Sequence, residues 1–189
     1  MEKEIFSFVS ENGKNTVHGQ LWIPDAEPCA ILQIAHGMTE FVDRYDEFAR
    51  FMNTQGIIVV GNDHIGHGSS VSDSSEWGYF APKAGSECAV KDMEHVTIMM
   101  KEKYPKLPCF LLGHSMGSFM TRRYIMNHGR NINGVIIVGT GNQPVMEIVA
   151  GKALIKIIRA FKGDMYRSSL LNKMMFATYN TTILPPSPT

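Results

Sequence analysis

The sequence predicts an α/β fold with a doubly wound, mostly parallel sheet. Short apolar runs of strand length alternate with longer segments of helical periodicity, and glycine or proline marks most junctions between them. Strands that alternate with helices in this way indicate parallel βαβ units. Of the 189 residues, 44% are hydrophobic and 19% are charged, which is typical of a chain with a buried core and excludes an intrinsically disordered one.

The chain begins with a predicted hairpin. Residues 4–10 and 16–23 are rich in β-forming side chains and flank the turn-forming residues 11–14. The apolar run 29–35 follows and ends at His36-Gly37, which predicts a strand covered on both faces and a loop that begins at Gly37.

Further helices and strands alternate after this loop. Apolar positions recur at helical spacing over 41–55 and 87–103, and Gly56 and Pro105 stand where these helices end. The remaining predicted elements are buried strands at 57–60, 109–112 and 135–138, a polar loop at 63–82 and a helix at 116–127.

Beyond Gly141 the character of the sequence changes. Residues 146–162 predict a helix that is apolar except for one stripe of polar side chains. The stripe consists of Glu147, Lys152, Lys156, Arg159 and Lys162. Three prolines near the C-terminus exclude a helix or a central strand there. We therefore divide the chain into a core at 1–140, a partial helical cap at 141–180 and a disordered tail at 181–189.

Charge and cysteine content narrow the function classes. Eighteen basic against eighteen acidic residues give no net charge, so the sequence lacks the electrostatic footprint of a nucleic-acid-binding protein. No segment has the composition of a signal peptide or of a membrane-spanning helix. The three cysteines form no CxxC pair. We expect a cytoplasmic protein with reduced thiols and without a metal or another cofactor.

The strongest chemical signal is Gly113-His114-Ser115-Met116-Gly117, which matches G-x-S-x-G between an apolar strand and a helix. The two glycines let strand and helix approach closely around a serine on a sharp turn. The helix that begins at Met116 directs its free amide groups toward a developing oxyanion. Ser115 is therefore the predicted nucleophile of an α/β-hydrolase fold.

A second constellation, His36-Gly37-Met38, lies at the end of the strand that feeds the first crossover helix. Hydrolases of this fold take one oxyanion donor from this loop and the other from the residue after the nucleophile. The predicted donors are the backbone N–H groups of Met38 and Met116. For His36 we favour a structural, hydrogen-bonded role over that of a base.

These blocks resemble the monoacylglycerol lipase and lysophospholipase-like α/β hydrolases, which are grouped with serine aminopeptidases. The likeness rests on residues 36–40 with the nearby Arg44-Tyr45, on residues 63–70 and on residues 113–118, in the family's order. Where members usually have arginine in the middle block, this chain has His64-Ile65. The resemblance implies hydrolysis of carboxylic esters, of acylglycerols or lysophospholipids.

Two features have competing interpretations. His64 and His67 match an H-x-x-H metal pair, but a third ligand is not evident and tight glycine turns explain the loop, so we predict no metal site. The basic stripe of 146–162 suits an interfacial helix that contacts a membrane surface transiently. We favour a cap helix over the active site, and the two interpretations are compatible in a lipase.

The partners of the nucleophile do not follow in the expected order of serine, acid and histidine. After Ser115 the sequence holds one histidine, His128, and two acids, Glu147 and Asp164. His128 lies thirteen residues further on, at the far end of the predicted helix and roughly 20 Å away. We therefore expect a fold truncated within the cap region, whose uncovered sheet edge and core would favour self-association.

The leading hypothesis is a serine hydrolase that cleaves esters of small lipid-like substrates through an acyl-enzyme on Ser115. One alternative is a catalytically impaired fragment that acts only in binding or assembly. The other is a different α/β-hydrolase activity, such as that of a peptidase or a thioesterase.

Overall fold

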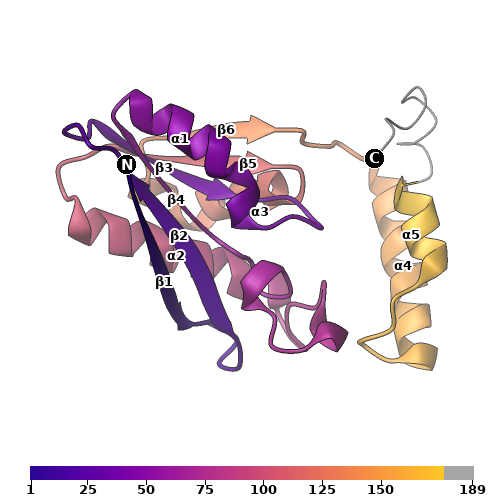
Figure 1. Ribbon diagram of the computed structural model, residues 1–189. Coiled ribbons are helices and arrows are strands. Elements are labelled where there is room, and N and C mark those ends of the chain that lie inside the picture. The colour runs from indigo at the N-terminus through magenta and orange to yellow at the C-terminus, as the bar shows by residue number, and fades with distance from the viewer. Residues whose placement is uncertain (177–189) are drawn as a thin grey trace, which may run out of the picture. The chain divides into compact units, whose positions relative to one another are not determined.

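The chain forms two compact units, Met1–Asn142 and Gln143–Thr189. A computed structural model describes residues 1–176 (Figure 1). The first unit holds a six-stranded sheet with helices on both faces, and the described part of the second unit is helical. The predicted tail at 181–189 and the last residues of the predicted cap lie outside the described residues.

The order of elements follows the predicted alternation. The strands are β1 (Glu2–Val9), β2 (Thr16–Ile23), β3 (Ala30–Ala35), β4 (Ile57–Asn62), β5 (Cys109–His114) and β6 (Gly134–Val138). The helices are α1 (Asp46–Thr54), α2 (Gly85–Lys103), α3 (Met116–His128), α4 (Val145–Lys162) and α5 (Ser169–Phe176). Short 3₁₀ turns occupy η1 (Val42–Tyr45), η2 (Gly68–Ser70), η3 (Ser74–Glu76) and η4 (Gly129–Asn131).

The sheet has the strand order β1-β2-β4-β3-β5-β6. The β1/β2 hairpin and the β2/β4 pair are antiparallel, whereas β4/β3, β3/β5 and β5/β6 are parallel. From β3 the chain first adds β4 on one side and then β5 on the other, so β3 and β5 flank the point where the strand order reverses. Open α/β sheets bind ligands at the carboxyl ends of the strands at this point. The doubly wound, mostly parallel sheet is confirmed.

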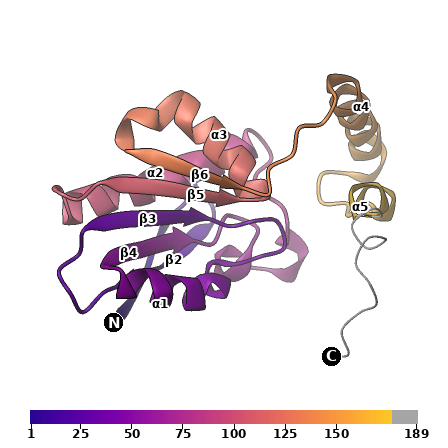
Figure 2. The same ribbon diagram turned by 90° about the horizontal axis from the view of Figure 1, so that it is seen from above.

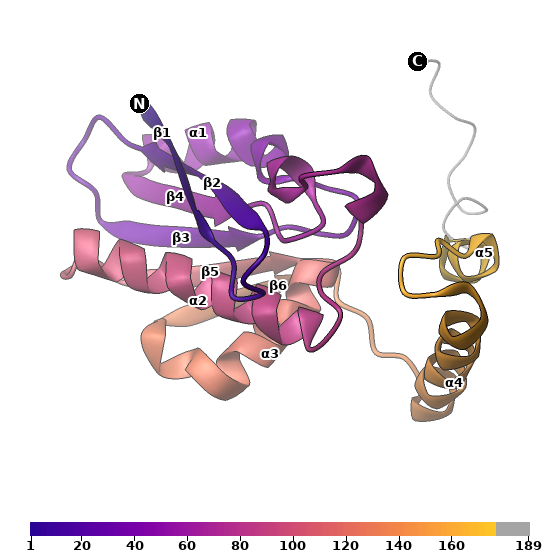
Figure 3. The same ribbon diagram turned by 90° about the horizontal axis from the view of Figure 1, so that it is seen from below.

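Helices cover both faces of the sheet, as Figure 2 and Figure 3 show: α1 lies on one face, and α2 and α3 lie on the other. Each layer has its own apolar core. On the α1 side the buried residues are Trp22, Leu32, Ile34, Val42, Ala49, Val59 and Leu112. On the side of α2 and α3 they include Ile31, Ile58, Val90, Met93, Val96, Leu111, Met120 and Tyr124.

One strand prediction was wrong in its burial. β6 was expected to be covered on both faces, but Val135, Ile136 and Val138 are 37%, 46% and 43% exposed. The reason is its place in the sheet, because within the described residues β6 pairs with β5 alone and forms an edge.

The second unit contains the predicted helix 146–162 as α4, which begins one residue earlier at Val145. It ends at Lys162, and the next residue, Gly163, has a φ of +84°, which suits glycine. Next to this end, Arg159 Nη2 donates to Asp164 Oδ2 at 2.7 Å. Within residues 1–176, no helix combines the length and apolarity that crossing a membrane requires.

Candidate active site

Ser115 lies on the sharp turn between β5 and α3. Its φ of +51° and ψ of −115° place a residue with a side chain in a sparsely populated region, at a cost of about 1–3 kcal/mol. The turn is held on both sides, since the Ser115 N–H donates to Val138 O at 2.9 Å and the Ser118 N–H donates to Ser115 O at 3.0 Å. This strained strand-to-helix turn is the geometry expected of a nucleophile elbow.

The two glycines of the motif allow α3 to approach the sheet. A Cβ atom at Gly113 would lie 2.5 Å from Gly117 O, and one at Gly117 would overlap Ala35 O and lie 2.7 Å from His36 O. Any larger residue at either position would therefore push α3 away from β3 or β5. The first turn of α3, with Met116, consequently lies against the end of β3, where the predicted oxyanion loop begins.

The loop after β3 is anchored by a buried imidazole. His36 is 0% exposed, its Nδ1 lies 2.7 Å from Gly37 O, and its Nε2 accepts the His64 N–H at 3.0 Å. Thr39 in the same loop has a φ of +59°, a conformation that the surroundings must hold in place. This geometry agrees with a structural role for His36. Met38 lies between His36 and Thr39, both of which the surrounding structure holds in place.

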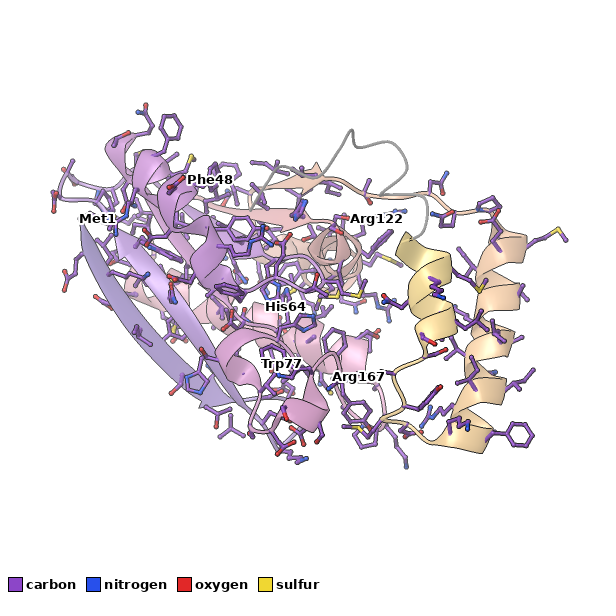
Figure 4. The ribbon with its side chains drawn as sticks, turned by 45° about the vertical axis from the view of Figure 1, so that its right-hand side comes forward. Met1, Phe48, His64, Trp77, Arg122 and Arg167 are labelled. Carbon is purple, nitrogen blue, oxygen red and sulfur yellow. The ribbon has the colours of Figure 1, made fainter. Side chains whose placement is uncertain are left out.

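The His36 ring lies against the His64 ring, with an interplanar angle of 36° and ring centroids 4.2 Å apart, and the His67 ring centroid is 5.4 Å from that of His36. Figure 4 shows His64 among the interior side chains of the first unit. Burial lowers the pKa of His36 to about 4 and also lowers the pKa values of His64 and His67. All three rings are therefore neutral near pH 7.

The loop that carries this histidine pair is fixed by a carboxylate. Asp63 accepts the Val42 N–H and the Ser69 N–H, both at 2.7 Å. Burial raises the pKa of Asp63, although these hydrogen bonds act in the opposite direction. In the part of the chain that the structure describes, no three His, Cys, Asp or Glu side chains converge as metal ligands. The His64 ring packs against His36, and among the described residues neither of its buried ring nitrogens has a hydrogen-bond partner.

Beside the elbow, a cavity of about 250 Å³ is lined by Glu40, Arg44, Tyr45 and His114. Glu40 and Tyr45 had no role in the sequence interpretation beyond the family likeness. The sequence did contain one signal for Glu40, because it is an acidic residue three positions after Gly37, within the loop predicted to supply an oxyanion donor. Another hollow, of about 510 Å³, lies between Glu11 and the outer side of α2 and is formed by other residues.

The described residues supply no base for Ser115. His128 stands at the C-terminal end of α3, and its Nδ1 lies 2.6 Å from Glu94 Oε1. Among residues 1–176, no side chain hydrogen-bonds the Ser115 hydroxyl. The structure thus brings together Ser115, Met116 and the loop of His36, Gly37 and Met38, and it separates His128 from them.

The sequence profile of the family described as serine aminopeptidase, S33, matches residues 26–182. The chain is 30% identical to the monoglyceride lipase of Homo sapiens over 169 residues, which cover 85% of this chain and 54% of the human protein. It is 28% identical to the monoacylglycerol lipase of Mycolicibacterium smegmatis over 156 residues, which cover 76% of this chain and 51% of that protein. The chain therefore spans about half the length of these curated relatives.

Two solved structures of hydrolases are also similar to this chain. A thermostable carboxyl esterase from Bacillus coagulans in complex with glycerol has a TM-score of 0.86 at 32% identity, over 100% of this chain and 61% of that chain. A lipase in an open form has a TM-score of 0.82 at 25% identity, over 96% of this chain and 59% of that chain.

Proposed function

Because this chain belongs to the serine aminopeptidase S33 family of α/β hydrolases, we propose that it acts in the hydrolysis of carboxylic esters through an acyl-enzyme on Ser115. The family likeness drawn from three sequence blocks is thereby confirmed. The observation that carries the proposal is the strained turn of Ser115, with a φ of +51°, between β5 and α3. Non-glycine residues in such conformations cluster at active sites, where the surrounding structure holds them in place.

In the proposed reaction, the Ser115 Oγ attacks the ester carbonyl and the Met38 and Met116 N–H groups stabilise the oxyanion. The C–O bond to the alcohol breaks, and the proton lost by the Ser115 hydroxyl passes to the leaving alkoxide through a base that the described residues do not supply. Water then hydrolyses the acyl-enzyme, which releases the carboxylic acid and restores the Ser115 hydroxyl. Each oxyanion donor in such a site is worth about 3–4 kcal/mol of transition-state stabilisation. The dipole of α3, which begins at Met116, acts in the same direction.

We further propose a lipid-like substrate, a monoacylglycerol or a lysophospholipid. Support comes from the relatives, which include monoglyceride lipases of Rattus norvegicus and Homo sapiens. The esterase from Bacillus coagulans was solved with glycerol, the alcohol part of an acylglycerol. Transient contact with a membrane surface through α4, self-association and a cytoplasmic location remain part of this proposal.

The described residues form the nucleophile and oxyanion half of the proposed site. His128, the one histidine after Ser115 in the 189 residues, is held by Glu94. A serine site without its base retains only the residual catalysis of the oxyanion hole and of substrate binding. For the chain of 189 residues, we therefore expect ester turnover orders of magnitude below that of a complete triad.

A fluorophosphonate probe tests the nucleophile directly. Because the described residues supply no base, we expect slow labelling of the parent chain, at high probe concentration and long exposure, and none of Ser115→Ala. Mass spectrometry should locate the adduct on the peptide that contains residue 115. Ser115→Ala keeps a Cβ and hence the backbone strain, so its fold is a fair match for the parent. Equal labelling of both chains would refute the proposal.

A second candidate, hydrolysis of aminoacyl amides, is favoured by the description of the family as serine aminopeptidases. Monoacylglycerols of different chain length and aminoacyl amides should be compared as substrates. Turnover of amides alone, lost in Ser115→Ala, would replace the lipid ester assignment. The absence of a base among the described residues favours a third candidate, a role in binding or assembly. Turnover that depends on Ser115 would exclude that candidate.

A further inference from the structure

One carboxylate links the oxyanion loop to the nucleophile elbow. Glu40 Oε2 accepts the backbone N–H of Gly37 at 3.2 Å and the Tyr45 hydroxyl at 2.9 Å. Its other oxygen, Oε1, lies 3.0 Å from His114 Nδ1. The Glu40 side chain is only 14% exposed, so these groups replace most of the water that a carboxylate would otherwise bind.

The partners of Glu40 are the immediate neighbours of the reacting groups. Gly37 precedes Met38, the first predicted oxyanion donor, and His114 precedes Ser115. The approach is close, because a Cβ atom at Gly37 would lie 3.1 Å from Glu40 Oε1 and 3.2 Å from His114 Nδ1. Glu40 therefore touches both segments whose separation determines where an oxyanion meets its donors.

Both segments contain a strained residue that must be held in place. Thr39 and Ser115 have φ values of +59° and +51°, and such conformations persist only where several contacts fix them. Glu40 is bonded directly to Thr39 in the chain, and its partner His114 is bonded directly to Ser115. One side chain thus restrains both strained turns.

The electrostatics favour an ionised Glu40. Partial burial acts to raise its pKa, but the hydrogen bonds from Tyr45 and Gly37 and the proximity of His114 lower the pKa below its usual value. Burial and the neighbouring Glu40 raise the pKa of Tyr45 far above its usual value, so its hydroxyl keeps the proton that it donates. An amide is a weaker substitute: its oxygen can accept from Gly37 and Tyr45 only as a neutral acceptor, and its NH2 group would face His114 Nδ1 where the second carboxylate oxygen now lies.

We infer that Glu40 is a positioning residue that fixes the oxyanion loop against the nucleophile elbow. This inference rests on the proposed function of Ser115. Among the described residues, the polar contacts of the Glu40 carboxylate are with Gly37, Tyr45 and His114 and not with Ser115 or the two proposed oxyanion donors. Its removal should therefore slow the chemical step more than it weakens binding.

The test compares the parent chain with Glu40→Gln, Tyr45→Phe and a control, Glu87→Gln. Glu87 makes a comparable but exposed contact, accepting from Arg123 Nε at 2.8 Å between α2 and α3. Labelling by the fluorophosphonate probe is measured over a range of concentrations, which separates the maximal rate constant kinact from the half-saturating concentration KI. For Glu40→Gln we expect kinact to fall at least about tenfold with KI unchanged, and for Tyr45→Phe about fivefold. Glu87→Gln should match the parent.

Amide hydrogen exchange provides a second measurement that needs no reaction. In Glu40→Gln we expect the Gly37 and Met38 amides to exchange at least about tenfold faster at an unchanged Tm, because the loop has lost its restraint. A kinact equal to that of the parent, or a rise in KI alone, would overturn the positioning role. If the parent takes no label at Ser115, the proposed function fails. In that case the exchange measurement still tests this inference: Gly37 and Met38 amides that exchange in Glu40→Gln as slowly as in the parent would overturn it as well.

Discussion

Replacing Gly117 with alanine should damage both stability and reactivity, because α3 has no room to accommodate a methyl group. The new Cβ would overlap Ala35 O and lie 2.7 Å from His36 O, whereas ordinary Cβ contacts begin at 3.4 Å. Ala35 O is the tighter obstacle, so the start of α3 must move by at least about 1 Å to reach even the shortest Cβ contact of 3.0 Å. Overpacking of this kind costs about 1–3 kcal/mol, and we expect the upper end because the obstacle is backbone.

The same shift would displace the Met116 N–H from the oxyanion that it is proposed to bind. Misplacement on the order of 1 Å costs about a hundredfold in rate, and complete loss of one donor costs about a hundred- to a thousandfold. The measurements are urea denaturation and the rate of Ser115 labelling. Gly117→Ala should lose about 3 kcal/mol of unfolding free energy and label at least about a hundredfold more slowly.

The matched control is Gly129→Ala at the other end of α3. Gly129 has a φ of −57°, and the nearest atom to its added Cβ, Ile125 Cβ, lies at 3.8 Å. This substitution should be neutral or stabilise by up to about 1 kcal/mol, with unchanged labelling. If Gly117→Ala and Gly129→Ala behave alike in both assays, the close approach of α3 to β3 does not control the site.

Three further predictions concern the interior. Burial lowers the pKa of His36 from 6.5 to about 4, so the unfolded chain binds more protons than the folded one between these values. The neutral His36 therefore stabilises the folded chain less as the pH falls, and its contribution to the unfolding free energy drops by about 3 kcal/mol from pH 7 to pH 4. Urea titrations at several pH values measure this change. If the unfolding free energy of His36→Gln depends on pH as steeply as that of the parent, the prediction is wrong. Tyr124→Phe removes the hydroxyl that donates to Thr97 Oγ1 at 3.0 Å and should cost about 1 kcal/mol in unfolding free energy; labelling of Ser115 should not change. Asp92 accepts Ser10 Oγ–H at 2.7 Å and the Glu11 N–H at 2.8 Å. Asp92→Ala would leave both donors without this acceptor, so it should lower the unfolding free energy by about 2–3 kcal/mol and lower the Tm with it. A Tm equal to that of the parent would show that water replaces the carboxylate.

Local patterns were sufficient for most of the fold. The predicted strand 16–23 is β2 without change, and the predicted helix 116–127 differs from α3 only at His128. Turn-forming residues bound both segments: residues 11–14 and Pro24 for the strand, and the Ser115 turn and Gly129 for the helix. The burial of β6 could not be predicted in the same way, because it depends on which strand lies next to it in the sheet and not on its own residues.

In the candidate site, too, local motifs could be predicted from the sequence and contacts between distant segments could not. Ser115 and its glycines form a contiguous motif, so five adjacent residues were enough to find them. The contact between Glu40 and His114 joins segments that are distant in sequence, and only the pairing of β3 with β5 brings them together. A single sequence carries no local signal for such a contact.

The backbone of Ser115 has a consequence for how variants of this protein would be selected. Glycine adopts a φ of +51° without the steric cost that serine bears, so Ser115→Gly should raise the melting temperature while it removes the nucleophile. A library screened only for heat resistance would therefore be enriched in chains that have lost the reactive hydroxyl. Any directed evolution of this scaffold needs an activity screen in every round.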